Sequence, residues 1–203
     1  MIRSNLNSDK YIQAGLDIGS DKICCAISEI DLKSDTVKLL GLGNSQATSI
    51  NRGAITHRDN LIDEIEYAID EARTMSGVSI ENLSLGISGE HIRGINTQGA
   101  IAIGGSQASN VSLQNEITKN DVKKVLELAK AISLPMDRDI LHVLPQEYVI
   151  DTMNSIKDPI GLTGRRLEAK VHVITVATTA ATNLVSCVEE LGIRVENIIY
   201  QGL

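Results

Sequence analysis

Apolar and polar positions alternate along the first part of the chain as they do in β-strands. Residues 11–18 carry apolar side chains at every second position, at Ile12, Ala14, Leu16 and Ile18. Residues 23–30 and 36–43 are predicted to be two further strands, and only short turns separate the three segments. Such close spacing predicts antiparallel hairpins. Residues 83–88 form another short apolar run, which predicts a fourth strand.

The apolar spacing before that fourth strand is that of an amphipathic helix. One face of the helix is formed by Leu61, Ile65, Ala68, Ile69 and Ala72. Thr56 and Asp59 have capping-box spacing, so we expect the helix to begin at Thr56, and Gly77 supplies a stop signal. The opposite face is acidic and indicates a solvated surface rather than a metal site. Its carboxylates belong to Asp63, Glu64, Glu66, Asp70 and Glu71.

The middle of the chain predicts a small α+β domain. Thr118 and Asp121 again have capping-box spacing and open a second amphipathic helix, which Pro135 closes. Residues 140–151 return to strand. The segment 86–165 is therefore predicted to be inserted between two parts of the first sheet.

The last part of the chain predicts a return to that sheet. Residues 171–176 are continuously apolar, as in a strand covered on both faces. Residues 178–191 have helical spacing, and residues 195–200 predict one more buried strand. The expected fold class is α/β, with a ribonuclease-H-like sheet formed by two segments and interrupted by the insertion. The predicted segments are 1–85, 86–165 and 166–203.

Composition narrows the range of functions that this chain can have. The chain has 203 residues and a formal charge of −7, with 42% hydrophobic and 22% charged residues, which is the range of globular proteins. It contains no Phe or Trp, so aromatic stacking on bases is not available, and its acidic balance opposes a phosphate backbone. We therefore expect no nucleic-acid binding.

The lack of a targeting signal and the pattern of cysteines lead us to expect a cytoplasmic protein. Residues 1–10 lack the apolar stretch of a signal peptide, and no run reaches the ~18 apolar residues of a membrane span. The three cysteines, Cys24, Cys25 and Cys187, show no zinc-binding spacing. Cys24 and Cys25 are adjacent in a predicted strand and point to opposite faces, so we expect buried free thiols.

The turn between the first two strands contains residue types that bind phosphate. Asp17 ends the strand, and Gly19, Ser20, Asp21 and Lys22 follow. A glycine turn lets backbone N–H groups approach an anion closely, while serine adds a hydroxyl donor and lysine a positive charge. Asp17 is placed to hold a hydrated Mg²⁺. These are also ordinary turn residues, so the motif alone leaves a plain hairpin open, whereas the predicted sheet around it favours a phosphate loop.

Other candidate residues have a structural explanation. His91, His142 and His172 lie in or beside apolar runs, which favours structural histidines. Arg165 and Arg166 form a lone basic pair, which indicates a solvated or salt-bridged turn. We therefore expect no catalytic residue among them.

Four stretches carry a family resemblance. They read GLDIGSDKI at 15–23, INRGAI at 50–55, ILHVLPQEYVID at 140–151 and DPIGLTGRRLEAKVHVIT at 158–175. The first alone would fit any actin, chaperone or sugar-kinase relative, but the last two together are specific. In these stretches, and over essentially the whole chain after about residue 10, the sequence resembles the FtsA family of bacterial cell-division actin homologues.

The resemblance implies an actin-like fold, with residues 1–85 and 166–203 as subdomain 1A and residues 86–165 as subdomain 1C. It implies that ATP and Mg²⁺ bind the intact protein, which would be at most a weak ATPase. The resemblance also implies that Asp17 is the metal-binding residue. The implied nucleotide-binding residues are Asp17, Gly19, Ser20, Asp21 and Lys22.

The family resemblance also implies partners and a location. Members polymerise and tether the FtsZ ring to the cytoplasmic face of the cell membrane at the division site. Subdomain 1C, here residues 86–165, is associated with later division proteins such as FtsN. FtsZ and the membrane are bound through a further subdomain and a C-terminal amphipathic helix, which are not found before Leu203.

The end of the sequence leads us to expect an N-terminal fragment. No second phosphate loop occurs before Leu203, so this chain is expected to bind ATP weakly or not at all and to be inactive alone. The main alternative is another actin-like scaffold, such as a pilus-assembly protein. A ribonuclease-H-like nuclease or a sugar kinase is a more distant alternative.

Overall fold

The fold comprises two compact units. A computed structural model of the chain describes residues 9–104 and 115–203. The first unit is drawn from residues up to Ile92 and from Val176 onward, and the second is Arg93–Thr175. None of the helices in the described part of the chain combines the length and the apolar character needed to cross a membrane.

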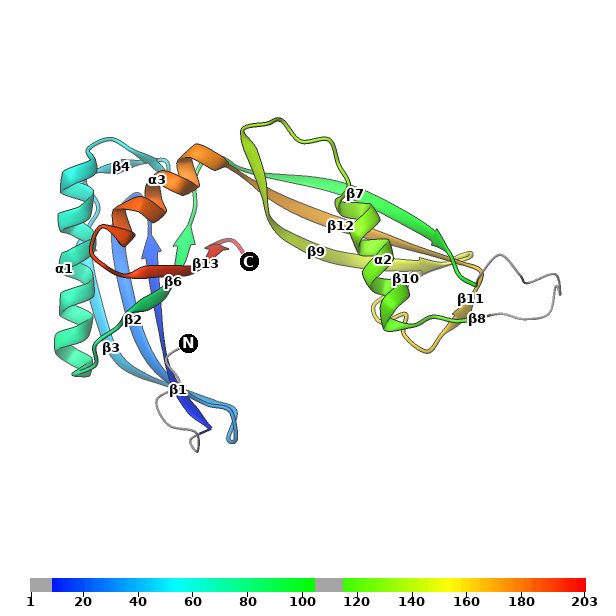
Figure 1. Cartoon of the computed structure of the whole chain (residues 1–203), viewed down its shortest axis with the longest axis horizontal. Coiled ribbons are helices and arrows are strands. Elements are labelled where there is room, and N and C mark those ends of the chain that lie inside the picture. Colours follow the sequence, from blue (N-terminus) through cyan, green and yellow to red (C-terminus); the bar gives the residue numbers. More distant parts are fainter. Residues whose placement is uncertain (1–8, 105–114) are drawn as a thin grey trace. The chain divides into compact units, whose positions relative to one another are not determined.

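The first unit is built on a five-stranded sheet with strand order β13-β6-β1-β2-β3 (Figure 1). The two hairpins β1–β2 and β2–β3 are antiparallel, as predicted, whereas β6 runs parallel to both β1 and β13. A strand order of this kind is that of a ribonuclease-H-like sheet. The elements are β1 Lys10–Ile18, β2 Lys22–Asp31, β3 Thr36–Gln46, β4 Ile50–Asn51, β5 Ala54–Ile55, α1 Arg58–Ser76, β6 Asn82–Ile87, α3 Thr178–Glu189 and β13 Arg194–Tyr200.

Helix α1 covers one face of this sheet through the predicted apolar stripe. All five stripe residues are buried, and Gly77 ends the helix in the left-handed conformation with φ of 67°. The helix lies very close to β3, because Gly41 and Gly43 face its backbone: a Cβ on Gly43 would lie 1.9 Å from the carbonyl oxygen of Ala68. The absence of side chains at these two positions sets the distance between helix and sheet.

The start of α1 differs from the prediction. Its N-cap is His57, which makes no side-chain capping hydrogen bond, so the predicted capping box of Thr56 and Asp59 is wrong. The backbone N–H of Thr56 donates to the carbonyl of Ser49 at 2.9 Å, which ties Thr56 to the segment before the helix. The same capping-box spacing does form at Thr118 and Asp121, where both reciprocal hydrogen bonds are present.

The acidic face of α1 is only partly the solvated surface that the sequence predicts. The Glu64 carboxylate accepts hydrogen bonds from the backbone N–H of Thr48 at 3.0 Å and from the Ser49 hydroxyl at 3.1 Å. Glu71 accepts from the backbone N–H of Asn44 at 2.6 Å. These two carboxylates therefore hold β3 and the segment after it against the helix.

The second unit is a four-stranded sheet with strand order β10-β9-β12-β7 and one helix, α2, on one face (Figure 1). Val125 and Ala129 of α2 are fully buried against the sheet, and Gly99 lies where a Cβ would clash with the helix backbone. The elements are β7 Ile92–Ala102, β8 Asn115–Glu116, α2 Lys119–Lys130, β9 Arg138–Ile150, β10 Met153–Ile156, β11 Thr163–Gly164 and β12 Arg166–Ala177.

Two predictions about the last part of the chain are wrong. The apolar run at residues 171–176 belongs to β12, which pairs in the four-stranded sheet and not in the first sheet. The chain crosses to the first unit only at Val176. The last strand, β13, is an edge strand rather than a buried one, and Ile199 in it is 42% exposed. An apolar run shows that a strand is buried but not which sheet buries it.

The close contact between β3 and α1 yields a stability prediction. Replacement Gly43→Ala should lower the free energy of unfolding by about 3 kcal/mol, because the new methyl group must displace helix backbone. Gly15→Ala is the matched control, since a Cβ at Gly15 meets nothing within 4 Å, and its effect should stay below about 1 kcal/mol. Urea unfolding followed by circular dichroism measures both. Equal effects of the two replacements would contradict the packing argument.

Candidate functional site

The predicted phosphate turn lies at the end of β1, where the chain reverses into β2. The backbone N–H of Gly19 donates to the carbonyl of Lys22 at 3.1 Å and closes the turn. The N–H of Ala47 donates to the carbonyl of Asp21 at 3.0 Å and holds the turn from the side of β3. Local hydrogen bonds therefore fix the loop before any ligand arrives.

Two backbone donors in this turn have no partner in the part of the chain that the structure describes. Within the described residues, the N–H groups of Ser20 and Asp21 take part in no hydrogen bond, and both residues are exposed. Successive unpaired N–H groups in a turn form a binding site for an anion. The Lys22 side chain follows directly and adds positive charge.

Asp17 lies on the sheet face opposite α1. Its neighbours Leu16 and Ile18 are buried, so period-two alternation turns Asp17 to the other side. Its Oδ1 atom is inaccessible to solvent and has no hydrogen-bond partner among the described residues. Burial raises the pKa of this carboxyl, and the nearby charge of Lys22 lowers it by less.

Gly86 on β6 lies beside Asp17 and is not among the residues predicted for the site. The two residues are register partners, and a Cβ on Gly86 would lie only 3.2 Å from the Asp17 Oδ1 atom. A glycine inside a strand weakens the strand, so it often marks a position where another group must approach the backbone closely. The glycine at position 86 of the predicted strand is therefore the sequence signal that could have pointed to this contact. The bare backbone at Gly86 allows the carboxylate to lie this close to β6.

The turn and the carboxylate together fit a phosphate group and a hydrated cation. Unpaired N–H groups and a lysine suit phosphate oxygens, and a carboxylate oxygen without a partner suits a Mg²⁺ that keeps most of its water. No group of three or more His, Cys, Asp or Glu side chains in the described residues could hold a metal ion directly. All five predicted residues lie in or next to this one turn, namely Asp17, Gly19, Ser20, Asp21 and Lys22.

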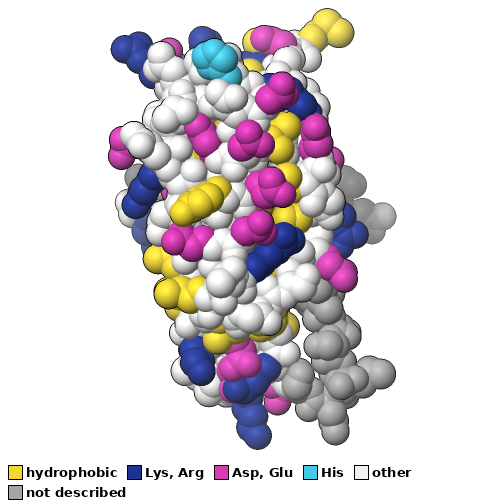
Figure 2. All heavy atoms as spheres, turned by 90° about the vertical axis from the view of Figure 1, so that its left-hand side faces the viewer, with side chains coloured by type: hydrophobic (Ala, Val, Ile, Leu, Met, Phe, Trp, Pro, Cys, Tyr) yellow, Lys and Arg dark blue, Asp and Glu magenta, His cyan; other side chains and the backbone are white. Residues whose placement is uncertain are grey.

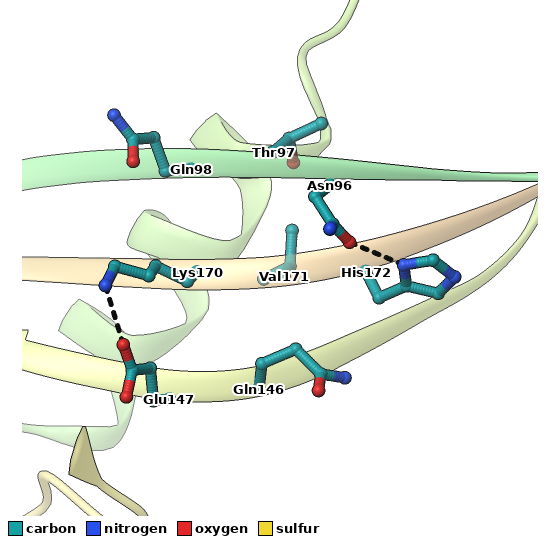
Figure 3. Close-up of a pocket in the computed structure, with 8 residues that line it drawn as sticks. All are labelled: Asn96, Thr97, Gln98, Gln146, Glu147, Lys170, Val171 and His172. Atoms are coloured by element: carbon teal, nitrogen blue, oxygen red, sulfur yellow. Dashed lines mark hydrogen bonds and ion pairs between the residues drawn. The ribbon is translucent and has the colours of Figure 1, made fainter.

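A second feature is the polar hollow on the four-stranded sheet, about 670 Å³ in volume (Figure 3). Lys170 on β12 donates to Glu147 on β9 at 2.6 Å, and His172 Nδ1 lies 2.6 Å from Asn96 Oδ1 on β7. The ion pair raises the pKa of Lys170 and lowers that of Glu147. These polar groups are paired with one another, so the hollow shows a hydrogen-bonded sheet surface and no arrangement of nucleophile and base.

The remaining candidate residues have structural roles. Arg166 pairs with Glu168 at 2.8 Å, and the backbone N–H groups of Arg165 and Arg166 both donate to Asp151. The predicted salt bridge is therefore present, but it lies at the start of β12 and not in a turn. The three cysteines are free. Burial raises the pKa of the Cys25 thiol to about 11, so that thiol stays protonated at neutral pH.

Comparison with known proteins agrees with this architecture. Residues 89–175 match the family model described as the SHS2 domain inserted in FTSA. The chain is similar to the cell division protein FtsA of Borreliella burgdorferi, with 39% identity over 189 residues that make up 93% of this chain and 44% of that protein. The FtsA of Escherichia coli K12 is 33% identical over 196 residues, 97% of this chain and 44% of that protein. The chain thus spans less than half the length of these curated relatives.

A solved structure shares the fold at low sequence identity. It is the PilM-PilN type IV pilus biogenesis complex, with a TM-score of 0.59 and 12% identity, covering 94% of this chain and 47% of that chain. At this identity the likeness concerns the fold alone.

A ribonuclease-H-like sheet interrupted by a small second domain defines the class as actin-like, with an inserted SHS2 domain. Within that class, nearly the whole chain is similar in sequence to FtsA cell-division proteins, and the inserted domain matches the SHS2 domain described for FTSA.

The buried carboxylate yields a pH-dependent prediction. Because burial raises the pKa of Asp17 above its ordinary value of 3.8, the ionised form is less favourable in the folded chain than in the unfolded chain. Its destabilising effect is absent below that value, grows as pH rises and is complete above the raised pKa. Replacement Asp17→Asn should therefore increase the free energy of unfolding at about pH 7, with a smaller increase at about pH 4.

Urea unfolding at both pH values measures this difference. Asp21→Asn is the matched control, because it makes the same charge change at an exposed position of the same turn. An Asp17→Asn effect that is the same at both pH values would show that the carboxyl charge is not responsible.

Proposed function

We propose that this chain carries one half of the nucleotide site of an actin-like cell-division protein. The observation that carries the proposal is the half-buried Asp17 carboxylate, which accepts no hydrogen bond within the described residues, beside a turn with two N–H groups that are also unpaired there. The N–H groups of Ser20 and Asp21 bind phosphate oxygens, and Lys22 offsets their charge. Asp17, held against the bare backbone of Gly86, would face the water shell of a Mg²⁺ ion through the accessible part of its carboxylate. The bound ATP would supply the triphosphate, and the cation would neutralise part of its charge.

The biological role follows from the family. The protein self-associates and tethers the FtsZ ring to the cytoplasmic face of the membrane at the division site, and its second unit contacts later division proteins such as FtsN. Support comes from similarity to FtsA along nearly the whole chain and from the SHS2 match at residues 89–175. FtsZ and membrane contacts belong to parts of the relatives that this chain does not span.

The alternatives have less support. A pilus-assembly scaffold shares the fold, but only at 12% identity. A ribonuclease-H-like nuclease needs further carboxylates that converge with Asp17, and the described residues contain no such cluster of three. A sugar kinase would use the same turn, but the curated similarity is to FtsA.

Nucleotide binding can be tested by NMR on the isotope-labelled chain. Titration with Mg-ATP into the millimolar range should shift amide signals of residues 18–22 and Gly86 first, because these line the turn. Binding should be weak, since one hairpin supplies few donors. Asp17→Asn should weaken it about tenfold, equivalent to about 1.4 kcal/mol. Asp35→Asn, in the remote β2–β3 turn, is the control and should change nothing. Shifts confined to other residues would contradict the proposal.

The division role can be tested with a chimera. In the FtsA of Escherichia coli K12, the segment that corresponds to Arg93–Thr175 is replaced by this unit. Cells that rely on the chimera should divide, whereas cells whose FtsA lacks the segment should form filaments. Filamentous cells that contain the chimera at normal levels would argue against a shared partner role.

A further inference from the structure

Helix α2 presents a basic outer face with an exposed apolar residue. Val125 and Ala129 point into the core, and Leu128, on another side of the helix, is 52% exposed. A hollow of about 520 Å³ lies along this face. It is lined by Ile101, Asn120, Lys123, Lys124, Glu127 and Leu128.

Most of the lysines on this face form no ion pair within the described residues. Lys130 pairs with Glu127 at 3.0 Å, but in the described residues Lys119, Lys123 and Lys124 form no ion pair. The whole chain carries −7, so this helix is a local exception to its acidic character. A hollow lined by two apolar side chains and two lysines suits a partner that presents an apolar side chain between carboxylates.

Helix α1 presents such a surface. Tyr67 is 64% exposed and is the only exposed residue among the four tyrosines of the chain, all of which the structure describes. Figure 2, which faces α1, shows carboxylate side chains gathered over this helix. Asp63 lies one turn before Tyr67 and Asp70 one turn after it, with Glu66 adjacent. Asp70 pairs with Arg73, whereas Asp63 and Glu66 form no ion pair within the described residues.

The spacing on the two helices matches. Asp63 precedes Tyr67 by four residues, and Lys124 precedes Leu128 by four. Each separation is about 6 Å along the helix axis. One contact can therefore place Tyr67 on Leu128 and bring Asp63 to Lys124. Tyrosine is enriched at the centre of protein interfaces because its ring buries a large area while its hydroxyl still finds a polar partner.

We propose that α1 of one copy of this chain docks on α2 of a second copy, with Tyr67 seated in the hollow and Asp63 and Glu66 facing Lys123 and Lys124. The contact joins two different surfaces, so the first copy keeps its α2 surface unused and the second copy keeps its α1 surface unused. Such a head-to-tail contact extends into chains or rings rather than stopping at a dimer. It gives the self-association in the proposed function a specific surface and rests on that function.

Sedimentation velocity of the complete 203-residue chain, without nucleotide, tests the contact. At low ionic strength the average mass should rise with protein concentration, and high salt should reverse the rise because it screens the charges. The double variants D63K/E66K and K123E/K124E should each weaken self-association at least about tenfold, since both surfaces then carry the same sign. Tyr67→Ser should weaken it with no change in charge.

Mixing the two double variants is the most direct test of the proposed contact. The lysines placed on α1 of one variant face the glutamates placed on α2 of the other, and the unchanged α1 and α2 also match, so association should return. The control K33E/K38E changes the charge by the same amount as K123E/K124E, at exposed positions in and beside the β2–β3 turn. It should associate like the original chain.

Two outcomes would overturn this contact. One is a chain that stays monomeric at every concentration at low salt, and the other is a mixture that fails to associate although both variants unfold like the original chain in urea. Neither outcome bears on nucleotide binding, which the NMR titration measures separately. Conversely, loss of Mg-ATP binding would leave the sedimentation result unchanged.

Discussion

Burial of one face of the five-stranded sheet under α1 is the constraint on which the rest of the first unit depends. Because side chains alternate between faces, burying Leu16 and Ile18 places Asp17 on the opposite face. A shift of register by one residue would bury the carboxylate under the helix. The close approach of α1 at Gly41 and Gly43 holds this register, since the helix backbone leaves no space for any other arrangement of β3. The candidate phosphate site is therefore a consequence of core packing.

The carboxylates of α1 fall into two groups: some accept structural hydrogen bonds, and others have no partner within the described residues. Glu64 and Glu71 accept backbone hydrogen bonds and stabilise the contact between α1 and β3. Asp63 and Glu66 on the same helix have no such partner within the described residues. An acidic helix is thus both a structural brace and an interaction surface, and only the contacts of each carboxylate separate the two. Helix α2 in the second unit has the opposite sign.

The main strands, the helices and the tight turn at Gly19 could be predicted because each depends on neighbours in sequence. The turn at Gly19 closes within four residues, and the apolar stripe of α1 depends only on helical periodicity. Capping was less predictable, since the same spacing forms a capping box at Thr118 and not at Thr56. The difference is that Thr56 is already hydrogen-bonded to Ser49, a contact that spacing does not show.

By itself the sequence determined the first hairpins, the acidic helix and the set of residues in the turn, because local periodicity and turn chemistry suffice for these. Only the tertiary structure decided that β12 pairs in the second sheet and that Gly86 lies beside Asp17. Both depend on which strands become neighbours across long stretches of chain. A buried strand looks the same in sequence whichever sheet buries it, and a glycine shows its role only when its neighbour is known.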